Sequence, residues 1–158
     1  MRLICCKDIN NLRLVECFGD DIPPYAVLSH TWFTDDDEPT YRDLLEGSGR
    51  AKVGFSKVRF CAERARHDGL EFVWVDTCTI NKESSAELSE AIVSMFRWYQ
   101  NAKTCYVYLS DVSVENGDAA IRRLTWEGAF RSSRWFTRGW TLQELLHRLN
   151  QPLPLETA

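Results

Sequence analysis

Residues 25–32 read Tyr-Ala-Val-Leu-Ser-His-Thr-Trp, an apolar run that ends in polar side chains. The part from Tyr25 to Ser29 follows a double-proline turn and predicts a buried strand. Two similar apolar runs lie at 72–76 and 105–109, and helical patterns separate the three. Apolar strands that alternate with helices imply right-handed crossovers and a parallel sheet, so the sequence predicts an α/β fold.

The predicted helices are marked by their ends. Thr40 begins a short helix that closes at Gly47, and a second helix ends at Gly69, because glycine commonly follows a helix C-terminus. Ser84 and Glu87 match a capping box, which satisfies the free amides of a first turn. The apolar positions at helical spacing are Val58, Cys61, Ala62 and Ala65 in the second helix, and Leu88, Ile92, Met95, Phe96 and Tyr99 in the third.

The length of 158 residues suits one domain with its own core. Residues 1–24 are predicted to form an N-terminal extension or a small hairpin, because parts of this segment alternate weakly. Residues 25–146 form the domain and include two more predicted helices, around 121–130 and at Trp140. Residues 147–158 contain two prolines and predict an irregular tail.

Composition excludes several classes of partner. The net charge of -4 disfavours a protein that binds nucleic acid through phosphate contacts. No run of about 18 apolar residues exists to span a membrane. The six cysteines form no Cys-x-x-Cys pair, which predicts reduced thiols in the cytoplasm rather than a disulfide framework or a zinc site.

Parallel sheets bind ligands beyond the carboxyl ends of their strands, and here polar residues follow each apolar run. The candidates are Ser29 and Trp32 after the first run, Asp76 after the second and Asp111 after the third. Asp76 either belongs to a site or caps the next turn, and both interpretations stay open.

Other groupings favour structural interpretations. Cys78 with His30 and Asp76 has the residue types of a thiol protease, but a buried cysteine at a strand end is the favoured interpretation. The acidic run Asp35–Glu38 lacks the spacing of a calcium loop and predicts a solvated loop. The three histidines have no zinc-type spacing, so we expect no metal.

Arg134 to Leu146 reads RWFTRGWTLQELL. Trp140 and Glu144 are four apart and therefore share one face of a helix. Taken alone, Glu144 would be a solvated helix glutamate, and Trp135 and Trp140 would be core or interface aromatics.

Four motifs in order carry a resemblance to a known family: YAVLSHTW at 25–32, FVWVDTCTINK at 72–82, SAELSEAIVSMFRWY at 85–99 and RGWTLQEL at 138–145. Together they resemble the fungal heterokaryon-incompatibility (HET) domain, of the type that is N-terminal in fungal NOD-like receptors. HET domains are in turn distantly similar to Toll/interleukin-1 receptor (TIR) domains, which are flavodoxin-like, and many of which cleave NAD.

The resemblance implies a flavodoxin-like, TIR-related parallel sheet flanked by helices. After Leu146 the chain departs from the HET pattern, so we expect the last C-terminal strand and helix to be missing. The chain is then a stand-alone effector, a truncated product or a fragment.

The resemblance also implies site residues. TIR enzymes carry the catalytic glutamate in a Trp-Cys-x-x-Glu-Leu pattern after a serine-containing loop. Here Ser132 and Ser133 precede Trp140 and Glu144, with Thr141 in place of the cysteine. Glu144 is therefore expected to be catalytic. The expected substrate-binding residues are Ser29, Trp32, Asp76 and Trp140.

By the same resemblance, the expected function is cell-death signalling in heterokaryon incompatibility and innate immunity. The expected reaction is that of an NADase, a hydrolase that cleaves the nicotinamide–ribose bond of NAD, with NAD as substrate and no cofactor. Expected partners are further copies of the chain, as an oligomer, or a NOD-like receptor or another HET-domain protein. The alternative is a non-enzymatic interaction module that kills through assembly.

Overall fold

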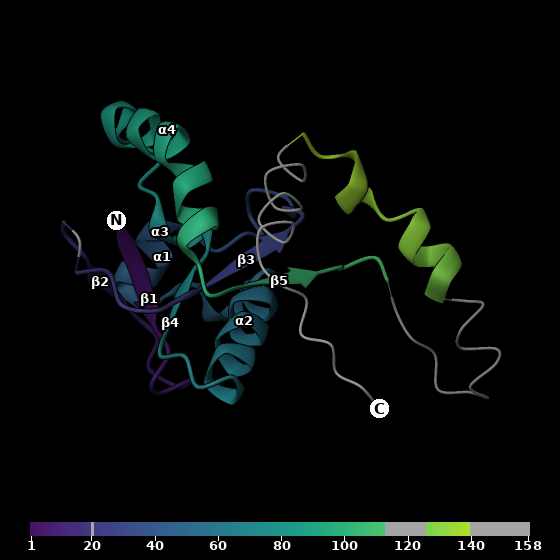
Figure 1. Ribbon diagram of the computed structural model, residues 1–158. Helices are drawn as coiled ribbons and strands as arrows, with labels where there is room; N and C mark the ends of the chain where they lie inside the picture. The colour runs from purple at the N-terminus through teal and green to yellow at the C-terminus, as the bar shows by residue number, and fades with distance from the viewer. Residues whose placement is uncertain (20, 113–125, 140–158) are drawn as a thin grey trace.

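The computed structural model describes residues 1–19, 21–112 and 126–139 (Figure 1). Within them, five strands form one sheet in the order β2-β1-β4-β3-β5. The strands are β1 (Arg2–Cys5), β2 (Arg13–Glu16), β3 (Ala26–His30), β4 (Phe72–Trp74) and β5 (Thr104–Tyr108). The three apolar runs predicted as strands are thus confirmed, although the second ends at Trp74 rather than at Asp76.

The sheet is mixed. β3 pairs in parallel with β4 on one side and β5 on the other. β1 pairs antiparallel with both β2 and β4. The prediction of a parallel sheet is therefore right for β4, β3 and β5, and wrong for β1, which pairs antiparallel with both β2 and β4. The physical reason is that β1 and β2 are joined by a short connection, which suits an antiparallel hairpin, whereas parallel strands need a longer crossover.

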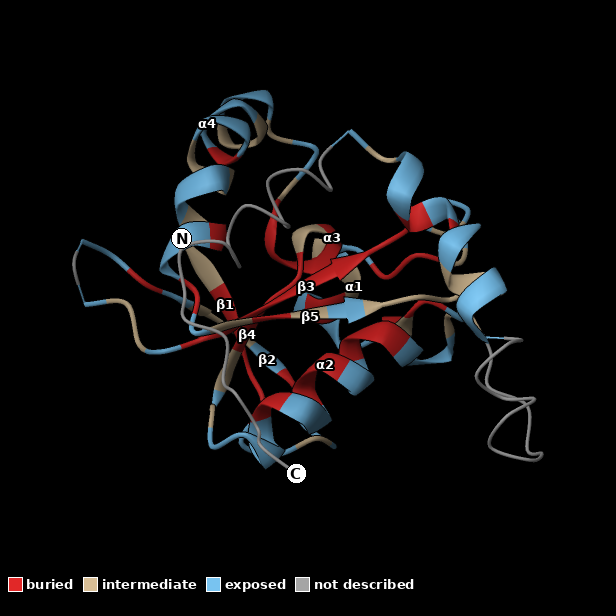
Figure 2. Ribbon diagram, turned by 45° about the vertical axis from the view of Figure 1, so that its right-hand side comes forward, coloured by how far each residue is buried: buried red, intermediate tan, exposed pale blue. Residues whose placement is uncertain are grey.

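Helices cover both faces of the sheet. They are α1 (Tyr41–Glu46), α2 (Phe55–His67), α3 (Asp76–Thr79) and α4 (Ser85–Asn101), with 3-10 turns η1 (Gly49–Ala51) and η2 (Arg134–Thr137). The apolar side of α2 packs with Ala26 and Leu28, whereas α4 packs with Val27. Because neighbouring residues of a strand point to opposite faces, α2 and α4 lie on opposite sides of the buried sheet (Figure 2).

The helix ends follow local chemistry. Thr40 caps α1 in a reciprocal capping box with Asp43, and Gly47 ends it in the left-handed region at φ 73°. The predicted capping box of α4 is only half present. Ser84 accepts the amide of Glu87, but the Glu87 carboxylate accepts from the Asn81 amide and from Arg2 of β1 instead. α4 is thereby tied to the N-terminal hairpin.

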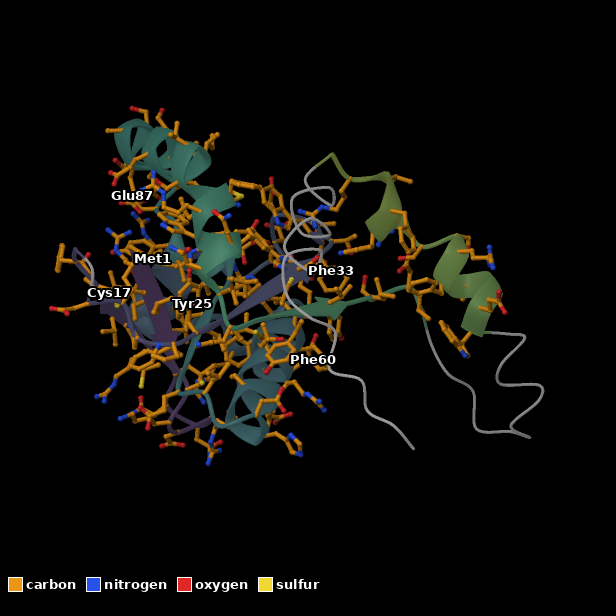
Figure 3. The ribbon with its side chains drawn as sticks, in the orientation of Figure 1. Met1, Cys17, Tyr25, Phe33, Phe60 and Glu87 are labelled. Atoms are coloured by element: carbon orange, nitrogen blue, oxygen red, sulfur yellow. The ribbon has the colours of Figure 1, made fainter. Side chains whose placement is uncertain are left out.

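A buried ion pair fixes the loop after β3. Lys57 of α2 donates to Glu38 at 2.6 Å and to the Thr31 carbonyl at 3.0 Å, and both charged side chains are almost fully buried. Glu38 also accepts the amide of Phe33 at 2.9 Å. Lys57 Nζ also lies 4.3 Å from the centre of the ring of Phe33, a residue of the same loop that Figure 3 labels. The prediction of a solvated acidic run is therefore wrong for Glu38, although Asp35 and Asp36 are exposed.

Burial and the neighbouring charge both affect the pKa values of Glu38 and Lys57. Burial alone would raise the pKa of Glu38, but the nearby His30 ring and the hydrogen bonds from Lys57 and the Phe33 amide outweigh it and lower the pKa to about 2. Burial lowers the pKa of Lys57, and the Glu38 carboxylate partly offsets this effect. Glu38 is therefore ionised in the folded protein at neutral pH.

We expect Lys57→Met to lower the free energy of unfolding by about 3–5 kcal/mol, because it leaves the Glu38 carboxylate buried without its cation. The double variant Lys57→Met/Glu38→Gln should recover a large part of this loss. Urea unfolding at pH 7 measures both. Arg59→Met, which removes an exposed pair with Glu63 on the same helix, is the matched control and should cost less than about 0.5 kcal/mol. Additive losses in the double variant would contradict the coupling.

Glu38 should also contribute to acid sensitivity. Because its folded pKa of about 2 lies below the value of 4.5 in an unfolded chain, its stabilisation is complete above about pH 4.5 and is lost as the pH falls towards 2. Between pH 7 and pH 2, the free energy of unfolding should fall by about 3 kcal/mol less in Glu38→Gln than in the unsubstituted protein. Asp35→Asn, in the exposed part of the same loop, is the control. Parallel curves for all three proteins would refute this assignment.

Candidate functional site

The candidate site lies at the carboxyl ends of the three parallel strands. β3 is the first of them in the chain and lies between the other two: the chain passes from β3 through α2 to β4 on one side, and from β4 through α4 to β5 on the other. The crevice between β3 and β5 is a topological switch point, where open α/β sheets bind ligands. Thr31 and Ser110, just past the two strands, approach to 3.2 Å between their hydroxyl oxygens.

A cluster of ionisable side chains lies beneath this edge. The His30 Nε2 atom is 3.5 Å from Glu38 Oε1 and 3.6 Å from Asp76 Oδ1. The imidazole is buried, and neither ring nitrogen has a hydrogen-bond partner within the described part of the chain. His30 therefore sits between two carboxylates at distances too long for a normal hydrogen bond. Within the described ranges, no group of three or more His, Cys, Asp or Glu side chains is placed to hold a metal ion.

Asp76 makes two hydrogen bonds at the end of β4, and its substrate-binding role stays a prediction. It begins α3, where Oδ1 accepts the amide of Thr77 at 2.8 Å. Its Oδ2 atom accepts the indole N–H of Trp32 at 3.0 Å. Trp32 is about half exposed, and Lys82 Nζ lies 3.8 Å from the centre of its ring. The carboxylate thus accepts one main-chain amide in the first turn of α3 and holds the Trp32 side chain beside it.

Ser29 holds a neighbouring element. Its hydroxyl is buried and accepts the indole N–H of Trp135 at 2.6 Å, which attaches η2 to β3. Asp111, after β5, accepts from the Ser133 hydroxyl and the Arg134 amide, both at 2.8 Å. The two strand ends therefore position η2 together. The substrate-binding role of Ser29 stays a prediction.

A cleft opens between η2 and the end of β3. Thr31, Trp32, Arg134, Thr137 and Arg138 line it, and its volume is about 340 Å³. Arg138 also donates to the main-chain carbonyl of His30. An indole, two hydroxyls and two guanidinium groups form a surface suited to an anionic ligand that carries an aromatic ring.

Sequence reasoning missed several of these residues. Arg134 and Arg138 lie inside the tryptophan-rich stretch, but no spacing rule marked them as ligands. Lys57 left a clearer signal, because it occupies the same helical face as Cys61 and Ala65 and is charged on an otherwise apolar stripe. Glu38 gave none, since it closes a run of acidic residues.

The thiol-protease grouping is not supported. Cys78 is fully buried, and its Sγ donates to the Pro39 carbonyl at 3.4 Å. Burial raises the pKa of this thiol to about 12, so the nucleophilic thiolate is not formed at neutral pH. The prediction of a buried cysteine is confirmed, and all six cysteines are free and buried.

Glu144 and Trp140, the other two predicted site residues, lie outside the described residues. The predicted helix whose face Trp140 and Glu144 would share also lies outside the described residues. No helix within the described ranges is both long and apolar enough to cross a bilayer.

Comparison with known proteins identifies the family. A family model described as heterokaryon incompatibility protein (HET) matches residues 25–131. The chain is similar to the vegetative incompatibility protein HET-E-1 of Podospora anserina, with 52% identity over 147 residues. The alignment covers 92% of this chain but only 11% of that protein. No solved structure matches the chain. With more than half of its length matched, and with the β3, β4 and α4 motifs inside that match, the chain belongs to the heterokaryon incompatibility (HET) family.

Proposed function

We propose that this chain is a cell-death effector domain of fungal heterokaryon incompatibility that hydrolyses the nicotinamide–ribose bond of NAD. The observation that carries the proposal is the cleft at the switch point, lined by Trp32, Arg134 and Arg138. NAD combines aromatic rings with a pyrophosphate, and indole and guanidinium groups are the side chains that bind these two features.

The proposed chemistry needs a single carboxylate. The nicotinamide leaving group is already a cationic pyridinium, so no general acid has to protonate it. Glu144 hydrogen-bonds the ribose hydroxyls and stabilises the positive charge of an oxocarbenium-like transition state, as carboxylates do in glycoside hydrolysis. Trp140, one helical turn earlier in the sequence, flanks the same part of the substrate. Both assignments rest on the resemblance to TIR enzymes.

The described residues supply the support for this chemistry. Asp76 holds the Trp32 indole, and the Lys57–Glu38 pair holds the loop that carries it. Asp111 holds η2, which brings Arg134 to the cleft. A cleft that is positioned before the ligand arrives loses less conformational entropy on binding.

We expect Glu144→Ala to reduce the rate of NAD cleavage by the purified chain about 100-fold or more, because one group that stabilises developing charge contributes about that much. The same substitution should abolish cell death on inducible expression in fungal cells. Glu63→Ala on α2, an exposed glutamate that pairs with Arg59 along its helix, is the matched control and should leave both unchanged. An equally stable Glu144→Ala protein with full activity would refute the catalytic role.

A second candidate function is assembly without catalysis, and one surface favours it. Trp126, Phe130, Phe136 and Trp135 form a chain of edge-to-face ring contacts with centroids 5.0–5.5 Å apart. Trp126 and Phe136 remain 39% and 42% exposed. Exposed aromatic patches commonly mark interfaces, and a second copy of the chain is the proposed occupant. In the enzymatic proposal, the same association activates the site.

The same proposal places the chain in the cytoplasm. It also includes a NOD-like receptor or another HET protein as a partner.

Phe136→Ser should shift the chain towards monomer in sedimentation measurements, because it removes apolar surface from the proposed interface. The expected weakening of self-association is about tenfold. Phe18→Ser is the control, because Phe18 is 76% exposed on the N-terminal segment and makes no part of this cluster. Specific NAD-cleaving activity should fall with association in the first variant only. Activity that stays constant down to concentrations with only monomer would exclude activation by self-association.

A further inference from the structure

Positively charged side chains lie near Trp32. Lys82 Nζ stands over the indole at 3.8 Å from its centre, and Lys82 itself is exposed. Arg134 and Arg138 line the cleft beside the same indole. One cation therefore stands over the Trp32 ring, and two more line the cleft that this ring borders.

Carboxylates neutralise this positive field only in part. Asp111 is 3.9 Å from Arg134 Nε and is held mainly by the Ser133 hydroxyl and the Arg134 amide. Asp76 is bound to the indole N–H, on the edge of the Trp32 ring rather than over its face. Within the described residues, Lys82 thus lies over a face of the indole, Asp76 binds its edge, and Asp111 holds the η2 turn.

We infer that this cleft binds the adenosine diphosphate half of NAD, with the adenine against Trp32 and the pyrophosphate at Arg134 and Arg138. This rests on the proposed function in taking NAD as the ligand. The nicotinamide ring of NAD is a cation, so it is repelled by Lys82 and by both guanidinium groups. Adenine is neutral and stacks on an indole without that penalty, and the pyrophosphate carries the negative charge that guanidinium groups bind.

This binding mode places the reacting bond of NAD away from Trp32. The nicotinamide–ribose bond then lies at the end of the substrate that is remote from Trp32. Trp32 and Lys82 act in recognition and not on the reacting atoms. Lys82 determines specificity, because its charge on the indole selects against a cationic ring.

Titration calorimetry of the purified chain tests the inference without any turnover. The ligands are adenosine diphosphate and nicotinamide mononucleotide in its oxidised and reduced forms, of which only the oxidised form carries the ring charge. We expect adenosine diphosphate to bind at least about tenfold more tightly than oxidised nicotinamide mononucleotide, and the reduced form to bind more tightly than the oxidised form. Equal affinities for the two redox forms, or a preference for the oxidised form, would overturn the inference. So would the absence of adenosine diphosphate binding.

A charge reversal supplies the second arm. Lys82→Glu should narrow the preference for adenosine diphosphate over oxidised nicotinamide mononucleotide at least about fivefold. Lys103→Glu makes the same charge change at the opposite end of β5, where Lys103 is exposed, and should leave the preference within about twofold. An unchanged preference in Lys82→Glu would overturn the role of Lys82.

The two proposals fail separately. Adenosine diphosphate binding with the expected preference, but without NAD cleavage, would remove the proposed hydrolysis and support this inference. NAD cleavage combined with the reverse ligand preference would support the hydrolysis and overturn the inference.

Discussion

The Lys57–Glu38 ion pair is the interaction on which the arrangement of the site depends. Lys57 comes from the first turn of α2, on one face of the sheet, and Glu38 comes from the loop after β3. Joining them fixes the course of residues 31–39 over the carboxyl end of the sheet. The pair is buried, so water does not screen either charge, and each side chain makes a further hydrogen bond to the main chain. A buried pair of this kind contributes little net stability compared with an apolar one, but it penalises any arrangement that separates the two charges. It therefore specifies one loop conformation.

From this fixed loop a short series of contacts reaches the cleft. His30 lies between Glu38 and Asp76, and Asp76 in turn holds the indole of Trp32. On the β5 side, Asp111 and Ser29 hold η2 through its amide, its capping serine and Trp135. Polar side chains at three strand ends thus act as supports, and the residues that face the cleft come from the loop and from η2. This division explains why Ser29, a plausible ligand-binding residue by position, is buried beneath Trp135 in the structure.

The N-terminal hairpin extends the sheet on the side away from β5. The three parallel strands form the switch point, and the N-terminal hairpin covers the exposed edge of β4 at the far side. An uncovered edge strand would present free amides and carbonyls to other chains. Arg2 of the hairpin binds Glu87 of α4, and the amino group of Met1 donates to the Cys17 carbonyl at 3.0 Å. The hairpin is consequently an integral part of the described fold, even though the family match begins only at Tyr25.

The sequence by itself determined the elements that depend on local pattern. Continuous apolar runs identified β3, β4 and β5, glycines at 47 and 69 marked two helix ends, and the HET motifs identified the family. Tertiary structure alone decided what depends on residues distant in the chain. It turned Glu38 from a solvated acid into a buried one, because its partner Lys57 lies 19 positions away. It directed Glu87 to Arg2 rather than to its own helix cap, and it placed the Ser29 hydroxyl against the indole of Trp135. Hydrogen bonds and ion pairs between segments leave no periodic trace in the sequence, since they depend on which side chains the packed sheet and helices bring within a few ångströms.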